Sequence, residues 1–453
     1  MNNTFLLVIF QILLIWGVVI TIYVRATRRD GRAPIDDIGV LWLGIFALYT
    51  TIPPISWLFQ GCEYSPFAGR LFQAQPDTSE VVSLLNIGLA YLLGFAMVYM
   101  NLLKRVNRPS VKAQANISSA KMKGALLIVL TASLCGIVIN KMGLIRASDS
   151  YIDSYSAIAE LPLGLRQLLK MIGAFSSVAT LVFLVALLQR WPRYYWLLLF
   201  YAISLLVSIN PEGSRTEVAT GLFGIVLAWH VLIRPIKTRW VLTGGALGLL
   251  VFLILGIIRN YGSLNGAGDQ GLGVVGFGEF DSIWANAVEL LQSKQNNGIV
   301  VPFAARFGEL YSFIPSQFLW FDKLDLPNWY LDTYYPALKE QGGGLAFGII
   351  SQAIIGAGIF EAVIRGAILG IIISKIMKWV RMPTNTWWRF PLHLYILISV
   401  FQLIRYSTFI IWGNIVQTVF PTFVVIAIIG SLLKSFLTRN QKISTDIQCI
   451  PNP

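Results

Sequence analysis

A short segment with an arginine and a glutamate is the first place in the chain where charge chemistry is plausible. It runs from Asn210 to Glu217 and contains Gly213 and Arg215. A guanidinium group binds phosphate oxygens in a bidentate manner, and the free N–H groups at the start of a helix also favour anions. Glu217 is close enough to pair with Arg215 or to serve separately as a base. The alternative is an interfacial arginine that reaches toward lipid headgroups.

Arg405 is a second candidate because it interrupts an otherwise almost wholly apolar stretch, Pro391–Leu433. A charge at such a depth in a membrane is costly, so it usually faces a polar cavity or a partner. The other interpretation is that Arg405 marks a turn between two membrane spans.

The longest polar segment of the chain is a predicted loop of about 84 residues, Arg259–Gly342. It carries nine Asp or Glu, five Lys or Arg and fifteen Phe, Trp or Tyr. Its first residue, Arg259, lies directly after an apolar run. Within the loop, the spacing of apolar residues predicts a helix over Phe280–Gln292, with Asp281 or Ser282 as its cap.

A second helix is predicted within the loop over Pro302–Phe313. It starts with proline in the first turn, and it places Arg306 and Glu309 three residues apart on one face. The many aromatic residues suit stacking on sugar rings, and they suit an amphipathic lid at the membrane interface equally well.

Glycines follow the loop. Gly342, Gly343 and Gly344 precede the sequence Ile355–Gly358, and such residues permit close backbone approach or a re-entrant bend. Glu361 and Arg365 come next, four residues apart, and are predicted to form an ion pair on one helix face.

The elements that position these residues are predicted to be membrane helices. Fifty-six per cent of the 453 residues are hydrophobic and thirteen per cent are charged, a balance typical of membrane proteins. We expect an all-α polytopic protein with about eleven transmembrane helices, within a range of ten to twelve. The apolar runs are 5–24, 38–59, 81–103, 124–140, 167–189, 194–209, 217–233, 240–258, 353–374, 391–404 and 409–433.

Lysine and arginine set the expected orientation. One set of alternating connections holds 22 of them and the other set holds 12. The basic set is expected to be cytoplasmic, which places the amino terminus outside, the loop 259–342 outside and the tail 434–453 inside. The net charge of +13 is then explained by topology and anionic lipid, without nucleic acid.

Residues 1–453 are therefore expected to form a single integral membrane domain. No nucleotide-binding glycine motif, metal-ligand spacing or Ser-His-Asp order is found, so no cofactor and no metal are expected. The two histidines, His230 and His393, fall near the expected cytoplasmic ends of spans. The predicted topology puts no two of the three cysteines in one compartment, which excludes a disulfide.

Taken together, these features resemble the O-antigen or oligosaccharide repeat-unit polymerases of the Wzy type. The likeness covers the chain from Asn210 to its end, and the amino-terminal half matches only in hydropathy. Its passages are Gly213–Thr216, Phe313–Lys323, Gly342–Gly344, Ile355–Gly358, the helix with Gly366 and Gly370, and Arg405.

The resemblance implies a membrane glycosyltransferase at the periplasmic face of the bacterial inner membrane. It would transfer a growing glycan from undecaprenyl pyrophosphate to the non-reducing end of a new lipid-linked repeat unit. Its partners would be that lipid-linked oligosaccharide and the bilayer, with a chain-length regulator and a flippase as further candidates. No nucleotide sugar is needed, because the pyrophosphate is already an activated leaving group.

Roles for individual residues follow as expectations. Arg215 and Arg405 are the first choices for stabilising the departing pyrophosphate, and Glu217 or Glu309 for the base. Binding of the second lipid-linked substrate is assigned to arginines and glycines near these groups, namely Arg259, Arg306, Gly213, Gly343 and Gly344.

Two departures from the family pattern leave the catalytic carboxylate open. Ser316 stands where many relatives have arginine, and Gln352 stands where a carboxylate often precedes the glycine turn.

Two other functions fit the same hydropathy. An O-antigen ligase uses the same lipid donor, but related ligases depend on an external histidine, and the loop 259–342 has none. A flippase or transporter more often shows repeat symmetry and more even loops.

Overall fold

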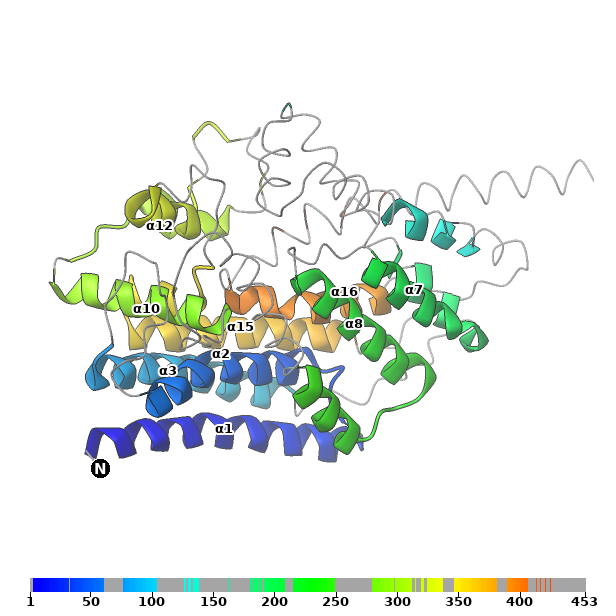
Figure 1. Ribbon diagram of the computed structural model, residues 1–453, viewed down its shortest axis with the longest axis horizontal. Helices are drawn as coiled ribbons and strands as arrows, with labels where there is room; N and C mark the ends of the chain where they lie inside the picture. Colours follow the sequence, from blue (N-terminus) through cyan, green and yellow to red (C-terminus); the bar gives the residue numbers. More distant parts are fainter. Residues whose placement is uncertain are drawn as a thin grey trace, which may run out of the picture.

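The computed structural model describes most of the long helical segments (Figure 1). The described residues are 3–31, 33–60, 76–103, 191–207, 215–248, 279–296, 298–311, 324–336, 346–380 and 389–405, with shorter pieces elsewhere. Every regular element within these residues is a helix, and they contain no strand. The predicted all-α class is confirmed for this part of the chain.

Three described helices are long and apolar enough to cross a membrane. They are α1 (Asn3–Asp30), α2 (Ile38–Gln60) and α3 (Thr78–Leu103). Each covers one of the first three predicted spans, and together they support a membrane protein. The total of eleven spans, the periplasmic loop and the orientation of the termini remain predictions.

Helix α15 (Ile359–Val380) lies along α3 for much of its length. Glycines permit this close approach, because a Cβ on Gly366 would strike the carbonyl of Tyr91 and one on Gly370 would lie 2.9 Å from that of Phe95. Small residues at such positions let membrane helices pack backbone to backbone. α15 carries one acidic and one basic residue in its first half, Glu361 and Arg365, and two lysines in its second half.

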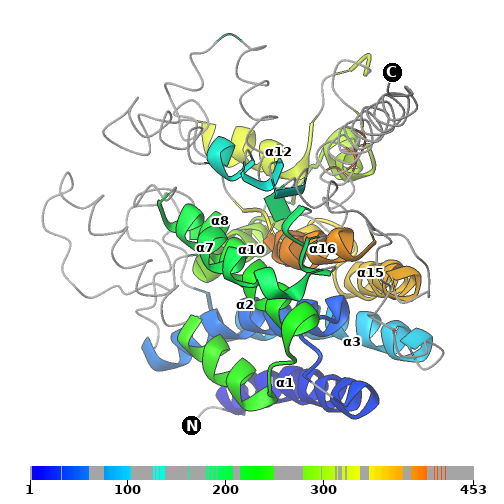
Figure 2. The same cartoon turned by 90° about the vertical axis from the view of Figure 1, so that its right-hand side faces the viewer.

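The helices form successive layers (Figures 1 and 2). α1 lies at one edge, α2 and α3 come next, and α15, α10 (Glu279–Asn296) and α16 (Arg389–Arg405) follow. α12 (Leu326–Tyr334) covers the far side.

The remaining described helices lie around α16 and α10. α7 (Trp196–Val207) and α16 both contact α8 (Arg215–Ala228), which continues into a π-helical turn at Trp229–Ile233. α14 (Ile349–Ile354) lies between α10, α15 and α16. A 3₁₀ turn occupies Pro192–Tyr194, and residues 238–248 are also helical.

The first helix predicted within the loop is confirmed as α10, but its predicted cap is wrong. The helix already begins at Glu279, so Asp281 and Ser282 lie inside its first turn. Carboxylates in the first turn still oppose the positive end of the helix dipole.

The second helix predicted within the loop is shorter than the sequence indicates. It consists of α11 (Phe303–Arg306) and a 3₁₀ turn, η4 (Gly308–Leu310). The chain at Leu324 crosses beside this segment, and its carbonyl lies so close to Gly308 that a Cβ there would collide with it. The Tyr311 hydroxyl donates to the same carbonyl at 3.0 Å and holds the crossing together.

The start of α3 carries a capping box, one member of which also contacts α10. The Asp77 carboxylate accepts from the Glu80 N–H at 2.7 Å, and the Glu80 carboxylate accepts from the Asp77 N–H at 2.9 Å. Gln292 on α10 also donates to Glu80 at 2.9 Å. The Glu80 carboxylate therefore takes part both in the local cap of α3 and in the contact with α10.

Candidate functional site

The segment α11–η4 folds back onto the turn between α14 and α15, where a cluster of charged side chains forms. Four of its members alternate in sign: Arg306, Glu361, Arg365 and Glu309. The predicted loop supplies two of them and α15 supplies the other two. We call these four residues, with Gln352 of α14, the charged cluster.

Glu361 bridges both arginines of the charged cluster. One carboxylate oxygen accepts from Arg365 Nε at 2.6 Å, which confirms the predicted pair at i and i+4. The other oxygen accepts from Arg306 and from the Ala357 N–H, the latter at 3.0 Å. A carboxylate at the first turn of a helix is also favoured by the helix dipole.

Glu309 completes the charged cluster from the loop side. It forms an ion pair with Arg365, and the side-chain amide of Gln352 donates to it at 3.4 Å. The Gln352 backbone carbonyl in turn accepts from Arg306 at 3.0 Å. Gln352, noted in the sequence as a departure from the family pattern, therefore ties the loop to α14 through both its backbone and its side chain.

Gly356 leaves the space in which this cluster is built. A Cβ at this position would overlap the Glu361 carboxylate and the Arg306 guanidinium. The glycine therefore lets two charged side chains approach the backbone closely, while the predicted re-entrant bend stays a prediction. Lys294 of α10 supports the same turn, because its ammonium donates to the carbonyls of Ile354 at 2.6 Å and Gly356 at 2.7 Å. A cation there satisfies carbonyls left free at the end of α14.

The members of the charged cluster differ in their access to the outside. The Arg306 side chain is 19% exposed, whereas that of Glu309 is 7% exposed. Arg306 is therefore the cation of the cluster that an incoming anion can reach most easily, and Glu309 is held behind it.

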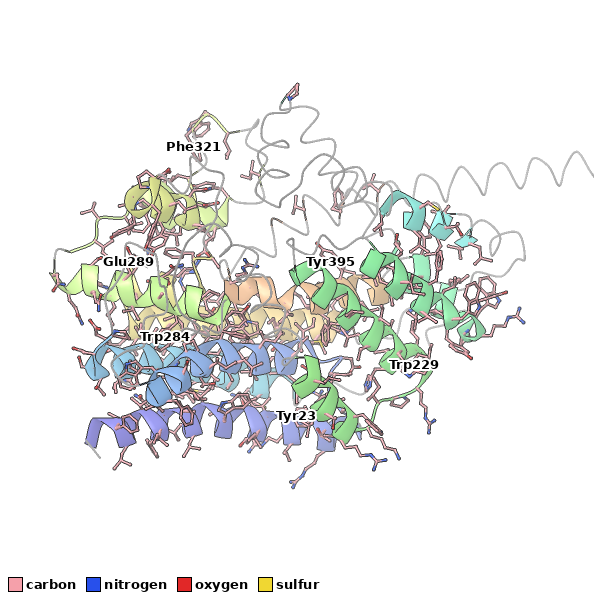
Figure 3. All side chains as sticks on the ribbon, in the orientation of Figure 1. Tyr23, Trp229, Trp284, Glu289, Phe321 and Tyr395 are labelled. Atoms are coloured by element: carbon pink, nitrogen blue, oxygen red, sulfur yellow. The ribbon has the colours of Figure 1, made fainter. Side chains whose placement is uncertain are left out.

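A second buried polar group holds α12 on α10. Glu289 of α10 lies on the side of that helix toward α12 (Figure 3). It accepts hydrogen bonds from the hydroxyls of Tyr330 and Tyr335, the latter at 2.7 Å. Asn286 donates to the Ala346 carbonyl at 2.6 Å, three residues before α14 begins. Burial, followed by the nearby Glu289 carboxylate, raises the pKa of Tyr330, so its hydroxyl stays protonated as a donor. This group therefore holds α12 and the segment before α14 against α10.

A small apolar pocket lies between α2, α10, α14 and α16. Its walls include Tyr49, Trp284, Ile350 and Ile404. None of the residues that line it is charged, so it offers no site for an anionic group.

The end of α16 also reaches this region. The carbonyl of Arg405 accepts from the Gly348 N–H at 2.9 Å, which places the last residue of α16 beside the first turn of α14. Arg405 therefore lies next to the start of the helix that carries Gln352. The structure describes α16 up to Arg405, and the residues that follow lie outside the described part, so the alternative in which Arg405 marks a turn between two spans stays a prediction.

Several predicted site residues are placed only in part. Arg215 is the first residue of α8 and Glu217 lies in its first turn, while their side chains lie outside the described part of the structure. Arg259, Gly213, Gly343 and Gly344 lie outside the described residues. Convergence of Arg215 with Arg405 stays a prediction.

Sequence reasoning missed Lys294 and Glu289. Lys294 has no local partner in the sequence, and its role depends on a turn 60 residues away. Glu289 did carry a signal, since it is an acidic residue in the middle of an otherwise apolar stretch, Ala287–Leu291. Within the described residues, no group of three His, Cys, Asp or Glu side chains is arranged to hold a metal ion.

Comparisons with known proteins found no match to this chain. No protein family, no curated protein and no solved structure matches it. The functional argument therefore rests on the residues and their geometry.

Proposed function

We propose that this protein polymerises lipid-linked oligosaccharide repeat units at the periplasmic face of the bacterial inner membrane. It would be a membrane glycosyltransferase that uses a polyprenyl-pyrophosphate-linked donor and requires no cofactor. The observation that carries the proposal is the charged cluster, in which Arg306 and Glu309 of the predicted external loop meet Glu361 and Arg365 of α15. The three apolar helices support a membrane location.

In the proposed reaction, a hydroxyl oxygen of the new repeat unit attacks the anomeric carbon of the growing glycan. The bond from that carbon to the pyrophosphate oxygen breaks, and undecaprenyl pyrophosphate leaves with the electron pair. The hydroxyl proton passes to a base. Fixed cations near the leaving group lower the barrier, because negative charge develops there in the transition state.

The residues divide into two groups under this proposal. Arg215 and Arg405 stabilise the leaving pyrophosphate, and Arg306 binds the second lipid-linked substrate or shifts onto the leaving group. Glu217 and Glu309 remain the two candidates for the base. Because Glu309 is engaged by Arg365 and Gln352, it would have to exchange a partner before it could accept a proton.

A variant series in cells that lack the chromosomal copy tests this assignment. Arg306→Gln is expected to reduce long-chain glycan by about 100-fold, as for loss of one transition-state contact. Arg306→Lys should retain part of the activity, since lysine keeps the charge and loses the bidentate geometry. Arg193→Gln, at an exposed arginine in the 3₁₀ turn after residue 191, is the matched control. Long chains of wild-type amount in Arg306→Gln would contradict the role of Arg306.

A second substitution separates the two arginine sites. Arg215→Glu is expected to abolish long chains while the amount of protein in the membrane stays unchanged. Wild-type chain length in this variant would remove Arg215 from the mechanism.

A further inference from the structure

Segment 303–310 of α11 and η4 is amphipathic in an inverted sense. Its charged residues, Arg306 and Glu309, point inward to the charged cluster. Its apolar residues at positions i, i+4 and i+7 point outward: Phe303 is 79% exposed, Phe307 41% and Leu310 56%. A loop that lies in water would normally show the opposite arrangement, with apolar residues inward and charges outward.

The outward residues form an aromatic ridge. The ring centroids of Phe303 and Phe307 are 4.5 Å apart. Together with Leu310, these residues form an exposed apolar surface on one short segment. We call Phe303, Phe307 and Leu310 the aromatic ridge.

Helix α15 has an exposed apolar stripe that ends beside this ridge. Its buried face, which includes Ala362 and Leu369, lies toward the helix bundle. Its other face exposes Ile359, Phe360, Val363, Ile364, Ile368 and Ile371. Because α15 packs along α3, a candidate membrane span, an apolar stripe on its free face is suited to lipid.

The two apolar surfaces are joined by the charged cluster itself. Arg306 lies between Phe303 and Phe307 in sequence, and it is ion-paired to Glu361, which follows Phe360 directly. The aromatic ridge is therefore tied to the first turn of α15, where the stripe begins.

We infer that the aromatic ridge lies in the outer leaflet of the bilayer, with lipid as its partner. Phe303 and Phe307 insert at the boundary between headgroups and acyl chains, where aromatic side chains are favoured. The ridge continues the lipid-facing stripe of α15, and the Arg306–Glu361 pair is held at the depth of the headgroups. This inference concerns position in the membrane and does not depend on the proposed chemistry.

Spin labelling of the full-length protein in lipid nanodiscs tests the inference. The three cysteines, Cys62, Cys135 and Cys449, are first replaced by serine. A nitroxide is then attached at Phe303→Cys or Phe307→Cys, in bilayers of phosphatidylcholine and phosphatidylglycerol. Collisions with oxygen, which is enriched in lipid, are compared with collisions with a water-soluble nickel chelate.

Two reference positions calibrate the readout. Ile364→Cys lies on the exposed stripe of α15 and represents lipid, and Asn328→Cys lies on an exposed position of α12 and represents water. Labels at Phe303 and Phe307 are expected to favour oxygen over nickel, with a ratio between those of the two references and distinct from that of Asn328.

Two results would overturn the inference. A ratio equal to that of the Asn328 label would place the ridge in water. Low collision rates with both reagents would show that protein, such as a second copy of the chain, covers the ridge. Thermal melting of each labelled variant confirms that the label has not unfolded the protein.

Discussion

At the residue scale, Glu361 is the centre of the charged cluster. It accepts from Arg365, from Arg306 and from the Ala357 N–H, so it connects α15, the loop and the turn before α15. Each of these groups has lost part of its contact with water. Removing the shared acceptor leaves Arg365 with Glu309 and Arg306 with the Gln352 carbonyl, so two partly buried guanidinium groups each lose a charged partner at once. That loss is more costly than the loss of one hydrogen bond.

Glu361→Gln is therefore expected to lower the free energy of unfolding by about 2 kcal/mol, because a neutral amide cannot replace a charged acceptor. Melting of the purified protein in detergent measures the change. Lys378→Gln is the matched control, since it removes one charge from an exposed position on the same helix. Equal melting temperatures for the two variants would show that the Glu361 carboxylate does not stabilise the folded protein.

At the element scale, the contact between α3 and α15 determines where the charged cluster can form. Gly366 lies against the backbone of α3, and its absent Cβ allows the two helices to approach closely. If the helices moved apart, the first turn of α15 would move away from α11, and Glu361 would lose Arg306.

Gly366→Ala is expected to destabilise the protein by about 1–3 kcal/mol, because the new methyl group meets main-chain atoms that have no rotamer to change. The control is Gly44→Ala in α2, where no heavy atom lies within 4 Å of an added Cβ. That substitution should be neutral or stabilising, since alanine is the better helix former. Melting curves of both variants give the comparison, and a Gly366→Ala protein as stable as wild type would contradict the close approach.

The capping box at the start of α3 predicts a pH dependence. The Glu80 N–H lowers the pKa of Asp77, so the folded state favours the carboxylate. Its contribution to stability is therefore present above the pKa of the unfolded chain, about 3.9, and is lost as the pH falls through the lower pKa of the folded state. Below about pH 4 the first turn of α3 should loosen.

Asp77→Asn tests this dependence, because asparagine caps a helix and does not titrate in this range. The melting temperature of the wild-type protein is expected to fall relative to that of Asp77→Asn as the pH falls below about 4. A difference that is constant from neutral to acidic pH would show that Asp77 contributes nothing through its charge.

At the scale of the whole molecule, local sequence patterns predicted the helices better than the contacts between them. The apolar runs predicted α1, α2 and α3, and helical spacing predicted α10 and the Glu361–Arg365 pair. These depend on residues within one helix, where periodicity and i,i+4 contacts act. The early end of the second loop helix was missed, and the local sequence also gave no sign that the chain at Leu324 packs against Gly308.

The charged cluster was predictable only in pieces. Arg306 and Glu309 were singled out by type and spacing, but their partners on α15 come about 55 residues later in the chain. No local rule selects such a pairing, since it depends on the fold of α10, α14 and the turn at Gly356. For the same reason the sequence did not indicate the contact from Lys294 to that turn.

The central claim is that the folded protein joins lipid-linked repeat units without any other enzyme. The most direct measurement uses purified protein, undecaprenyl-pyrophosphate-linked repeat unit extracted from the cells that express it, and no nucleotide sugar or metal. A gel should then show a ladder of products that differ by one repeat, and Arg306→Gln should show little or none. Folded wild-type protein that leaves the repeat unit unchanged would contradict the claim and would favour a ligase or a flippase.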